Sequence, residues 1–240
     1  MNRKNDTKVL LDEAVEQHKQ ITGGYEAALR NKSLDLRVPV KNAMENLRSA
    51  LDYMAHDIYE ACCQRNRIAN GLPDPKNIYF PYGRTLNDFK SGVGSSLPGL
   101  DTAFFPVYDL LLSIQPFTSR DKWLYELCFI LNENKHDRLT EQVRTETETH
   151  TVQGSQGSVT IPVNNPNVKV VSRPGAVKIF RVPAEFRQDG IHTAPSPGLK
   201  HIRTTWVGFK FAGTDVNVIG LLNKAVAGVR QFYDSLSKLI

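Results

Sequence analysis

Apolar residues recur at three- and four-residue steps in several segments of the chain, the spacing that places them on one face of a helix. The segments are 7–30, 39–66, 101–114, 121–131 and 215–240. The pattern is strongest in 39–66, where one face carries Met44, Leu47, Leu51, Met54, Ile58 and Cys62. The last segment repeats it with Val218, Leu221, Leu222, Ala225, Val229, Phe232 and Leu236. We therefore predict a helix in each segment, with these two faces buried.

Proline and glycine residues mark where the predicted helices begin, end or are interrupted. Gly23 and Gly24 lower helix stability and predict a bend or an interruption inside the first segment. Pro39 suits the first turn of the second helix, and Pro116 ends the third. Residues 70–100 are rich in both types and predict a loop, with a short extended piece at 78–82.

From Leu139 to Phe211 apolar and polar residues alternate, which is the period of a strand with one buried face. Residues 139–163 alternate around a Gly/Ser turn and predict a hairpin. Further strands are predicted at 167–172, 176–182 and 201–211. Because Pro- and Gly-bearing turns separate these segments, we expect one antiparallel sheet of about four or five strands.

Together these elements predict an α+β fold: an α-helical bundle with an inserted antiparallel β-sheet and a closing C-terminal helix. We expect the helical bundle in 1–138 and the β insertion in 139–213. The C-terminal helix, 214–240, is expected to pack back on the bundle. A chain of 240 residues is long enough to bury such a core.

The composition excludes only a few classes of function. The net charge of +5 permits contact with RNA or another polyanion without requiring it. Cys62, Cys63 and Cys128 lack metal-ligand spacing and are interpreted as reduced thiols. No apolar run has the length of a spanning helix, and the first residues lack the apolar core of a signal peptide. We therefore expect a cytoplasmic protein without membrane contact.

Arg48, Asp52 and His56 follow one another at four-residue steps beside the apolar face of the second helix. Side chains at this spacing contact each other, so the carboxylate would orient both cations and favour a protonated imidazole. Two interpretations stay open. The residues form a structural ion pair at the edge of the core, or they form a functional polar site in which the charges are half-buried.

The end of the helix predicted from residue 121 carries a second polar cluster, Asn134, Lys135, His136 and Arg138. Cations at a helix C-terminus complement the helix dipole, which explains this cluster without a function. Alternatively, the cluster converges with the second helix on one basic pocket. Arg48, Lys135 and Arg138 would then bind phosphate, with His136 or His56 as acid or base.

Other patterns have simpler explanations. Glu146, Glu148 and His150 share one strand face and could bind a divalent metal, but the solvated face of a hairpin accounts for them. The aromatic residues within 78–82 could stack on bases, but covering the core beneath a Pro-rich loop accounts for them better. The sequence has no Walker-type phosphate loop, dinucleotide fingerprint or nucleophile-elbow serine. It therefore predicts no cofactor and no metal.

The order of several short motifs resembles a widespread group of uncharacterised bacterial proteins. The motifs are "NLRSALD" at 46–52, "FP" at 80–81, "QPF" at 115–117 and "NENKHDRL" at 132–139. In that group they read NLRSALDHL, FPI, QPY and L.N.DKHR.L, followed by a β-rich region and a closing helix. The chain departs from this pattern at Tyr53, which replaces a histidine, and at Asp137, which is inserted. The resemblance implies a site without naming its chemistry, formed by Asn46, Arg48, Asp52, Asn134, Lys135 and His136.

More distantly, the helical part resembles the HEPN superfamily, helical bundles often found as RNases in toxin and phage-defence systems. HEPN RNases place an arginine and a histidine a few residues apart on one helix and pair them across a dimer. The arginine stabilises the phosphate and the histidine moves protons at the 2′-hydroxyl, without metal. For this chain the resemblance implies a homodimer with Arg48 and either His56 or His136 as catalytic residues, although more residues separate Arg48 from His56 than in that family.

Three hypotheses about function follow, and the sequence leaves enzymatic activity open. The first is a HEPN-like protein that binds or cleaves RNA, and it predicts that Arg48 and a histidine face one cleft. The second is a non-catalytic binding protein with a structural polar cluster, and it predicts that internal partners saturate Arg48, Asp52 and Lys135. The third is an enzyme acting on a small molecule or nucleotide, and it predicts a closed cavity.

Overall fold

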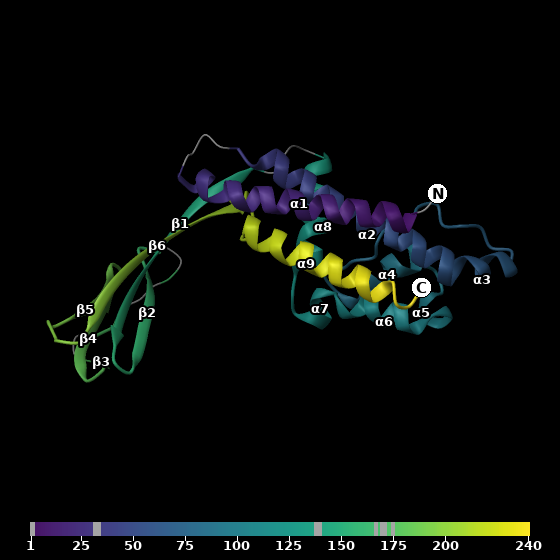
Figure 1. Ribbon diagram of the computed structural model, residues 1–240. Coiled ribbons are helices and arrows are strands. Elements are labelled where there is room, and N and C mark those ends of the chain that lie inside the picture. The colour runs from purple at the N-terminus through teal and green to yellow at the C-terminus, as the bar shows by residue number, and fades with distance from the viewer. Residues whose placement is uncertain (1–2, 31–34, 137–140, 166–167, 169–171, 174–175) are drawn as a thin grey trace. The chain divides into compact units, whose positions relative to one another are not determined.

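The computed structural model describes residues 3–30, 35–136, 141–165, 168, 172–173 and 176–240 (Figure 1). The chain divides into two compact units. The first, called the helical unit below, comprises residues 1–143 and 210–240, and the second, called the β unit, comprises residues 144–209. The predicted α+β class is confirmed, with helices, antiparallel sheets and a C-terminal helix.

Long helices that are far apart in sequence pack together in the helical unit. They are α1 (Arg3–Arg30), α2 (Arg37–Ile58), α8 (Trp123–His136) and α9 (Val218–Leu236). Helices α1 and α2 contact each other and α9, and α8 contacts α2 and α9, so the C-terminal helix closes the bundle (Figure 1). The glycine pair does not interrupt α1, and Ile21 and Tyr25 on either side of it are both buried, so core packing offsets the low helix propensity of glycine.

The apolar face predicted for α9 is confirmed residue by residue. Its buried residues are Val218, Leu221, Leu222, Ala225, Val229, Phe232 and Leu236. The helix begins at an N-cap, where the Asn217 side-chain oxygen accepts a hydrogen bond of 2.8 Å from the Gly220 amide. A clean stripe and a local capping signal agree here, which is why the sequence predicts this helix well.

The second predicted helix changes its winding before its end. The α-helical part of α2 is followed by a π-helical turn, Tyr59–Cys63, and then by α3, Gln64–Ala69. A π-turn adds one residue per turn and rotates all later side chains around the axis. Cys63 is therefore buried, whereas Cys62, predicted to face the core, is half-buried. Burial raises the pKa of the Cys63 thiol to about 12.

Short helices occupy the region between α3 and α8: α4 (Leu86–Ser96), α5 (Leu100–Ala103), α6 (Phe105–Ser113) and α7 (Pro116–Ser119). Helix α4 corrects the prediction of a continuous loop. A capping box between Thr85 and Asp88 starts it, and this signal is visible in the sequence. The helix predicted over 101–114 is divided, because Pro106 fits only the first turn of α6.

The β unit contains two antiparallel sheets rather than the single sheet predicted. One has the strand order β2–β1–β6 and the other β3–β4–β5. The strands are β1 (Gln142–Gly154), β2 (Gly157–Val163), β3 (Val177–Ile179), β4 (Val182–Arg187), β5 (Gly190–Thr193) and β6 (Lys200–Phe211). The strand predicted at 167–172 lies mostly outside the described residues.

Tight turns explain the second sheet. Phe180 and Arg181 both have positive φ, 49° and 71°, so the chain reverses after the short strand β3. It reverses again between Arg187 and Gly190, where a loop was expected. The buried apolar cluster of this unit contains residues of both sheets, Val152, Ile161, Val163, Ile179, Ala184 and Ile191. The short hairpins therefore form a sheet of their own that shares a core with β1 and β2.

No helix in the described part of the chain is long and apolar enough to span a membrane.

Candidate functional site

Side chains of two helices hold the extended segment that precedes α4. The Phe80 amide donates a hydrogen bond of 2.8 Å to Asp52 Oδ1 on α2. The Tyr79 amide donates one of 3.2 Å to the Ser96 hydroxyl at the end of α4. The Phe80 ring is buried and meets Phe232 of α9 edge-on at 5.1 Å. The segment is thus fixed by backbone bonds to polar side chains and by one apolar anchor.

Gln115 fixes the next residues of the same segment. Its side chain is fully buried, and its Oε1 accepts a hydrogen bond of 3.1 Å from the Gly83 amide. Its Nε2 donates to the carbonyls of Pro81, at 3.3 Å, and Leu111, at 3.0 Å. Gly83 is needed here, because a Cβ would lie 2.5 Å from the Phe89 backbone nitrogen. The "FP" and "QP" motifs are therefore joined by hydrogen bonds.

Arg48 makes contacts with three different side chains next to this segment. Its Nε donates to Asp52 Oδ2 and its Nη2 pairs with Asp52 Oδ1, both at 3.2 Å. Its Nη1 donates to Cys128 Sγ on α8 at 2.7 Å. Its Cζ lies 5.1 Å from the centre of the Tyr82 ring, a cation–π contact. The guanidinium thus connects α2, α8 and the extended segment.

Burial and neighbouring charge act against each other at Arg48. Its side chain is 13% exposed, so desolvation lowers its pKa. Cys128 and Asp52 raise the pKa by more, and the net pKa lies above the ordinary value. Burial raises the pKa of the Tyr82 hydroxyl, and the thiol of Cys128 adds to that effect. Arg48 is therefore cationic and Tyr82 neutral at physiological pH, and the Asp52 carboxylate compensates the Arg48 charge.

A pocket of about 420 Å³ lies beside the Arg48–Asp52 pair. It is lined by Arg48, Asp52, Tyr79, Phe80, Pro81, Tyr82, Gly92, Ser95, Ser96 and Asn132. This volume is within the range of small-molecule sites. Tyr79 is 55% exposed, so the pocket can be reached from solvent. We name it the Arg48 pocket.

Several polar groups of the Arg48 pocket keep hydrogen-bonding capacity. Arg48 has five N–H groups, and its contacts engage one on each nitrogen, which leaves one N–H on Nη1 and one on Nη2. The Ser96 hydroxyl accepts from Tyr79 and keeps its own proton to donate. The Tyr82 hydroxyl accepts from Asn132 Nδ2 at 2.7 Å and likewise keeps a donor. Donors and planar groups therefore face one small space.

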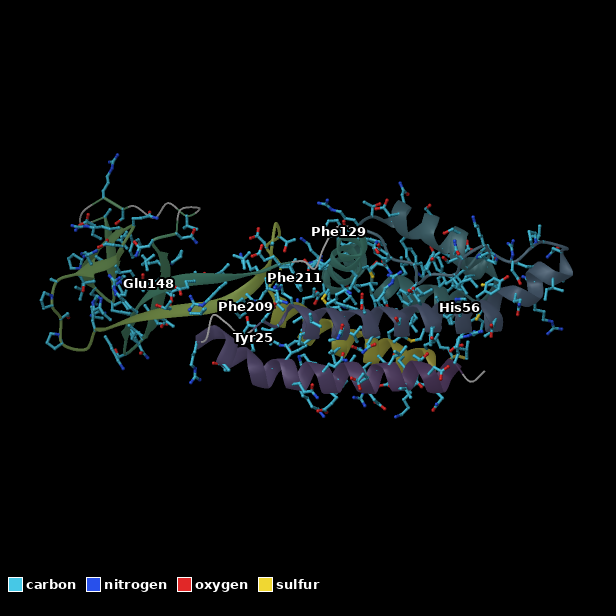
Figure 2. All side chains as sticks on the ribbon, turned by 90° about the horizontal axis from the view of Figure 1, so that it is seen from above. Tyr25, His56, Phe129, Glu148, Phe209 and Phe211 are labelled. Carbon is cyan, nitrogen blue, oxygen red and sulfur yellow. The ribbon has the colours of Figure 1, made fainter. Side chains whose placement is uncertain are left out.

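Only two of the four predicted site residues on α2 line this pocket. Arg48 and Asp52 line it, as the functional interpretation requires. Asn46 points to α1 instead, where its Nδ2 donates to Gln17 Oε1 at 3.1 Å. His56 is half-buried on α2 (Figure 2) and is not among the described residues that line the pocket. Asp52 contacts Arg48 and the Phe80 amide, and no hydrogen bond joins Asp52 to His56 among the described residues, so the expected Arg48–Asp52–His56 chain is not formed.

The structure describes the second predicted cluster only in part. Asn134, Lys135 and His136 belong to α8, but their side chains lie outside the described residues, as does the whole of Arg138. Sequence reasoning missed Asn132, which belongs to the same motif two residues earlier and reaches the pocket. It also missed Gln115 and Ser96. Gln115 lies within the "QPF" motif, and that motif was the one signal that could have indicated it.

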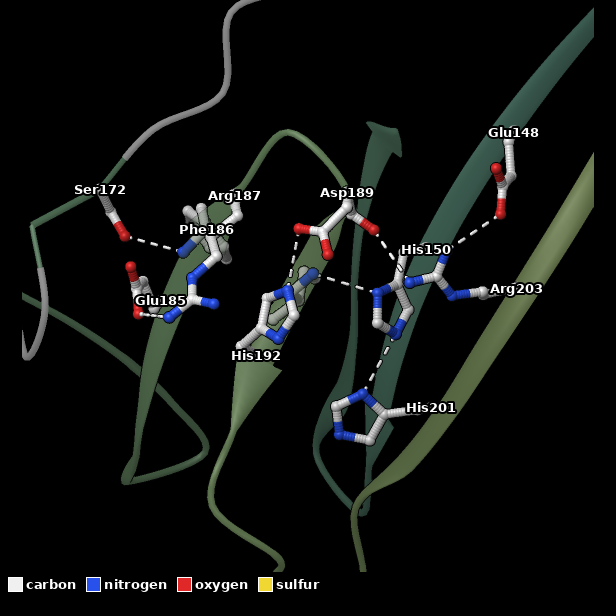
Figure 3. A network of polar contacts seen from close by, with 11 residues as sticks. Glu148, His150, Ser172, Glu185, Phe186, Arg187, Asp189, His192, His201 and Arg203 are labelled. Carbon is white, nitrogen blue, oxygen red and sulfur yellow. Dashed lines mark hydrogen bonds and ion pairs between the residues drawn. The ribbon is translucent and has the colours of Figure 1, made fainter. Parts of the chain in front are cut away.

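A second polar network lies in the β unit (Figure 3). His150 on β1 is 6% exposed, and its Nδ1 accepts a hydrogen bond of 3.0 Å from the Ile191 amide on β5. Its proton is therefore on Nε2, which lies 3.1 Å from His201 Nδ1 on β6. His201 in turn carries its proton on Nε2, which lies 3.2 Å from the Thr193 hydroxyl. Both rings are thus neutral, and all four ring nitrogens are engaged.

Charged groups surround this histidine pair. Arg203 on β6 donates to Glu148 Oε1 at 3.1 Å and to the Asp189 carbonyl at 2.9 Å (Figure 3). His192 Nε2 lies 3.0 Å from Asp189 Oδ1. Burial lowers the pKa of His150, and Arg203, His201 and His192 lower it further, whereas Asp189 opposes them weakly. The network therefore disfavours a proton on the buried ring.

Glu146, Glu148 and His150 do not form a metal centre with one another. Glu146 pairs with Arg144, Glu148 with Arg203, and His150 with a backbone amide. Within the described ranges, no group of at least three histidine, cysteine or acidic side chains is arranged to hold a metal ion.

Comparisons with known proteins do not add to this description. No protein-family model, curated protein sequence or solved structure matches the chain. Its function is therefore argued from the geometry of its own residues.

Proposed function

We propose that the chain is a non-catalytic binding protein that holds a nucleobase-bearing ligand, such as a nucleotide of single-stranded RNA, in the Arg48 pocket. The observation that carries this proposal is an accessible pocket lined by Tyr79 and Tyr82 beside a charge-compensated Arg48–Asp52 pair. Aromatic side chains and a guanidinium plane are the surfaces on which proteins stack unpaired bases. The volume of about 420 Å³ suits a single nucleotide better than a larger ligand.

The charge arrangement favours a base over a phosphate. A phosphate site needs cations whose charge is not already compensated. The Nε and Nη2 atoms of Arg48 both contact the Asp52 carboxylate, which compensates the charge of Arg48. The hydroxyls of Ser96 and Tyr82 and the remaining N–H groups of Arg48 can instead pair with carbonyl and ring-nitrogen acceptors of a base. The chain's net charge of +5 would attract the RNA backbone outside the pocket.

The aromatic residues in the 78–82 segment differ in burial and contacts. Phe80 is 1% exposed and packs on Phe232, so it covers the core. Tyr79 and Tyr82 line the pocket. The Tyr79 ring is 55% exposed and available for stacking, whereas Arg48 lies over one face of the Tyr82 ring. The core-covering interpretation thus holds for Phe80, and stacking on a base is our proposal for the tyrosines.

The described residues give no support to cleavage at this pocket. The HEPN-like hypothesis of metal-free RNA cleavage requires a histidine beside Arg48 as acid or base. His56 is not among the described residues that line the pocket, and the side chain of His136 does not belong to the described part of the chain. We therefore assign the Arg48 pocket to binding and let the experiment below detect cleavage separately.

The test is fluorescence anisotropy of a fluorescein-labelled ten-nucleotide oligouridylate with the full chain. Tyr79→Ser should weaken binding at least about fivefold, because one stacked base contributes about 1–3 kcal/mol. The matched control is Phe105→Ser, which removes a 60% exposed aromatic ring that does not line the pocket and should change the affinity less than about twofold.

Competition with free ligands separates a base site from a phosphate site. Uridine and uridine 5′-monophosphate should both displace the labelled RNA, whereas ribose 5-phosphate and inorganic phosphate should not. Equal displacement by ribose 5-phosphate would overturn the base assignment. Absence of binding to all these ligands at millimolar concentration would overturn the proposal as a whole.

The same samples, incubated without metal and resolved on a gel, report cleavage. We expect intact RNA. Cleavage that is lost in a folded Arg48→Ala variant would replace the non-catalytic assignment with an RNase.

A further inference from the structure

The helical unit holds a second pocket, of about 400 Å³, next to α7 and α8. One wall is aromatic: the rings of Tyr125 and Phe129 stack with their centroids 5.8 Å apart and an angle of 17° between their planes. Phe117 and Ile130 extend this apolar surface. Phe117 is 37% and Phe129 42% exposed, so two large aromatic side chains of this pocket face solvent; Phe129 is labelled in Figure 2. The pocket therefore offers a flat apolar wall to a ligand.

Two cationic side chains at the same pocket have no hydrogen-bond or ion-pair partner within the described part of the chain. Arg84 and Lys122 both line it and are both exposed. Neither side chain forms a hydrogen bond or ion pair with any other residue that the structure describes. Glu126 also lines the pocket and is half-buried. Two cations and one carboxylate leave the lining with a net positive charge, in contrast to the compensated pair of the Arg48 pocket.

We propose that this second pocket binds a small amphipathic carboxylate, with its aromatic or branched apolar body against the Tyr125–Phe129 wall and its carboxylate facing Arg84 and Lys122. The apolar wall supplies the affinity by removing ligand surface from water. The cations supply charge-assisted hydrogen bonds that select an anion. The two features must be present together in the ligand, because neither a small inorganic anion nor a hydrocarbon satisfies both.

Glu126 sets a limit on the charge of the ligand. Its carboxylate lies among the same lining residues and would repel an anion. Burial raises its pKa, with Lys122 and Lys224 opposing that effect, so its negative charge is already disfavoured. A monocarboxylate therefore fits better than a dianion.

The second pocket lies next to the proposed nucleobase site but is lined by different residues. Tyr82 lines the Arg48 pocket and Tyr125 lines this one, and their ring centroids are 6.4 Å apart. The two pockets share none of the residues that line them. A failure of one assignment thus leaves the other unaffected.

The test uses a matched set of ligands with one apolar body and three different charges. The ligands are 3-phenylpropionate, 3-phenylpropan-1-ol and 3-phenylpropylamine, titrated by calorimetry against the full chain at pH 7.5. We expect the carboxylate to bind about fivefold or more tighter than the alcohol, and the amine to bind no tighter than the alcohol. Absence of carboxylate binding at 10 mM, on the order of the weakest useful affinity, would overturn the proposal. Equal affinities for all three ligands would do so too.

Charge variants give a readout that a structural role would not produce. Arg84→Gln should weaken 3-phenylpropionate about fivefold and leave the alcohol unchanged. Glu126→Gln should tighten the carboxylate about twofold and weaken the amine, because it removes a repelling charge. The matched control is Lys90→Gln on α4, which removes an exposed cation that does not line this pocket. If Lys90→Gln has the same effect as Arg84→Gln, general electrostatics explain the binding and the assignment is wrong.

Discussion

The helical unit and the β unit each contain a polar cluster built from residues far apart in sequence, and the two clusters differ in what they leave unused. In the helical unit, Arg48 and Asp52 hold one another and the Phe80 amide, yet Arg48 keeps N–H groups at the edge of a pocket. In the β unit, every ring nitrogen of His150 and His201 is engaged. A cluster that retains donors beside a cavity can bind a ligand, whereas a saturated cluster fastens strands together. The predictions below test this distinction.

The largest effect is expected from Asp52→Ala. This change leaves the partly buried Arg48 charge and the Phe80 amide without their acceptor, which should lower the free energy of unfolding by about 2–4 kcal/mol. Urea unfolding followed by circular dichroism measures it. The matched control is Glu45→Ala, which breaks the more exposed Lys41–Glu45 pair at the same spacing on α2 and should cost less than about 0.5 kcal/mol. Equal losses in the two variants would contradict the described role of Asp52.

The next largest effect is expected from Gly190→Ala in the β unit. Gly190 has a φ of 143°, and a Cβ there would lie 2.3 Å from His150 Nδ1. Backbone strain and displacement of the imidazole should together cost about 1–3 kcal/mol, measured by urea unfolding of β-unit amide signals in NMR spectra. Gly157→Ala is the control, since Gly157 has a φ of 140° but open space around it. The difference between the two variants isolates the contact with His150.

Acidification should weaken the β unit more than the helical unit. Burial lowers the pKa of His150 in the folded state, below the value of about 6.5 expected in the unfolded chain. Between these two pKa values the unfolded state binds more protons, so stability is full above pH 6.5 and falls as the pH drops towards the folded pKa. Thermal unfolding of β-unit amide signals at several pH values measures this slope.

A matched pair of histidine variants tests the source of that slope. His150→Gln should reduce the pH dependence of the β unit, whereas His56→Gln, which changes a half-buried histidine of the helical unit, should leave it unchanged. A β unit whose stability does not vary between pH 7.5 and pH 5.5, roughly the range around an ordinary histidine pKa, would contradict the neutral, saturated pair.

The smallest effect is expected from Arg203→Gln. The Arg203 side chain is 50% exposed, so its pair with Glu148 should contribute less than about 1 kcal/mol to stability. The change should nevertheless raise the folded-state pKa of His150, because Arg203 is one of the cations that lower it. Titration of the His150 ring nitrogens by ¹⁵N NMR measures the shift. An unchanged titration would contradict a contribution of Arg203 to the lowered pKa of His150.

The regular helices could be predicted from the sequence because their signals are local. The buried face of α9 follows from the spacing of its apolar residues, and Asn217 marks its start. The same rule placed Arg48 and Asp52 together beside the core, since a four-residue step makes them neighbours on any α-helix. These predictions hold because no distant residue is needed to make them.

The remaining features depend on contacts that are distant in sequence or on small changes in winding. Cys62 was predicted to be buried because an α-helical period was continued through the π-turn, and a single residue of extra winding moved Cys63 into that place. The partner of Asp52 outside α2 is the Phe80 amide, and a backbone amide leaves no recognisable residue type in the sequence. The division of the β unit into two sheets follows from turns at Phe180 and Gly190 rather than from hydrophobic alternation.

The most direct test of the account is an NMR titration of the full, ¹⁵N-labelled chain with uridine 5′-monophosphate. We predict saturable shifts of the Ser95, Ser96 and Asn132 backbone amides, which belong to residues that line the Arg48 pocket. These shifts should weaken in Tyr79→Ser, and the β-unit amides should not move. Shifts confined to the β unit, or none at millimolar nucleotide, would contradict the assignment of the Arg48 pocket as the binding site.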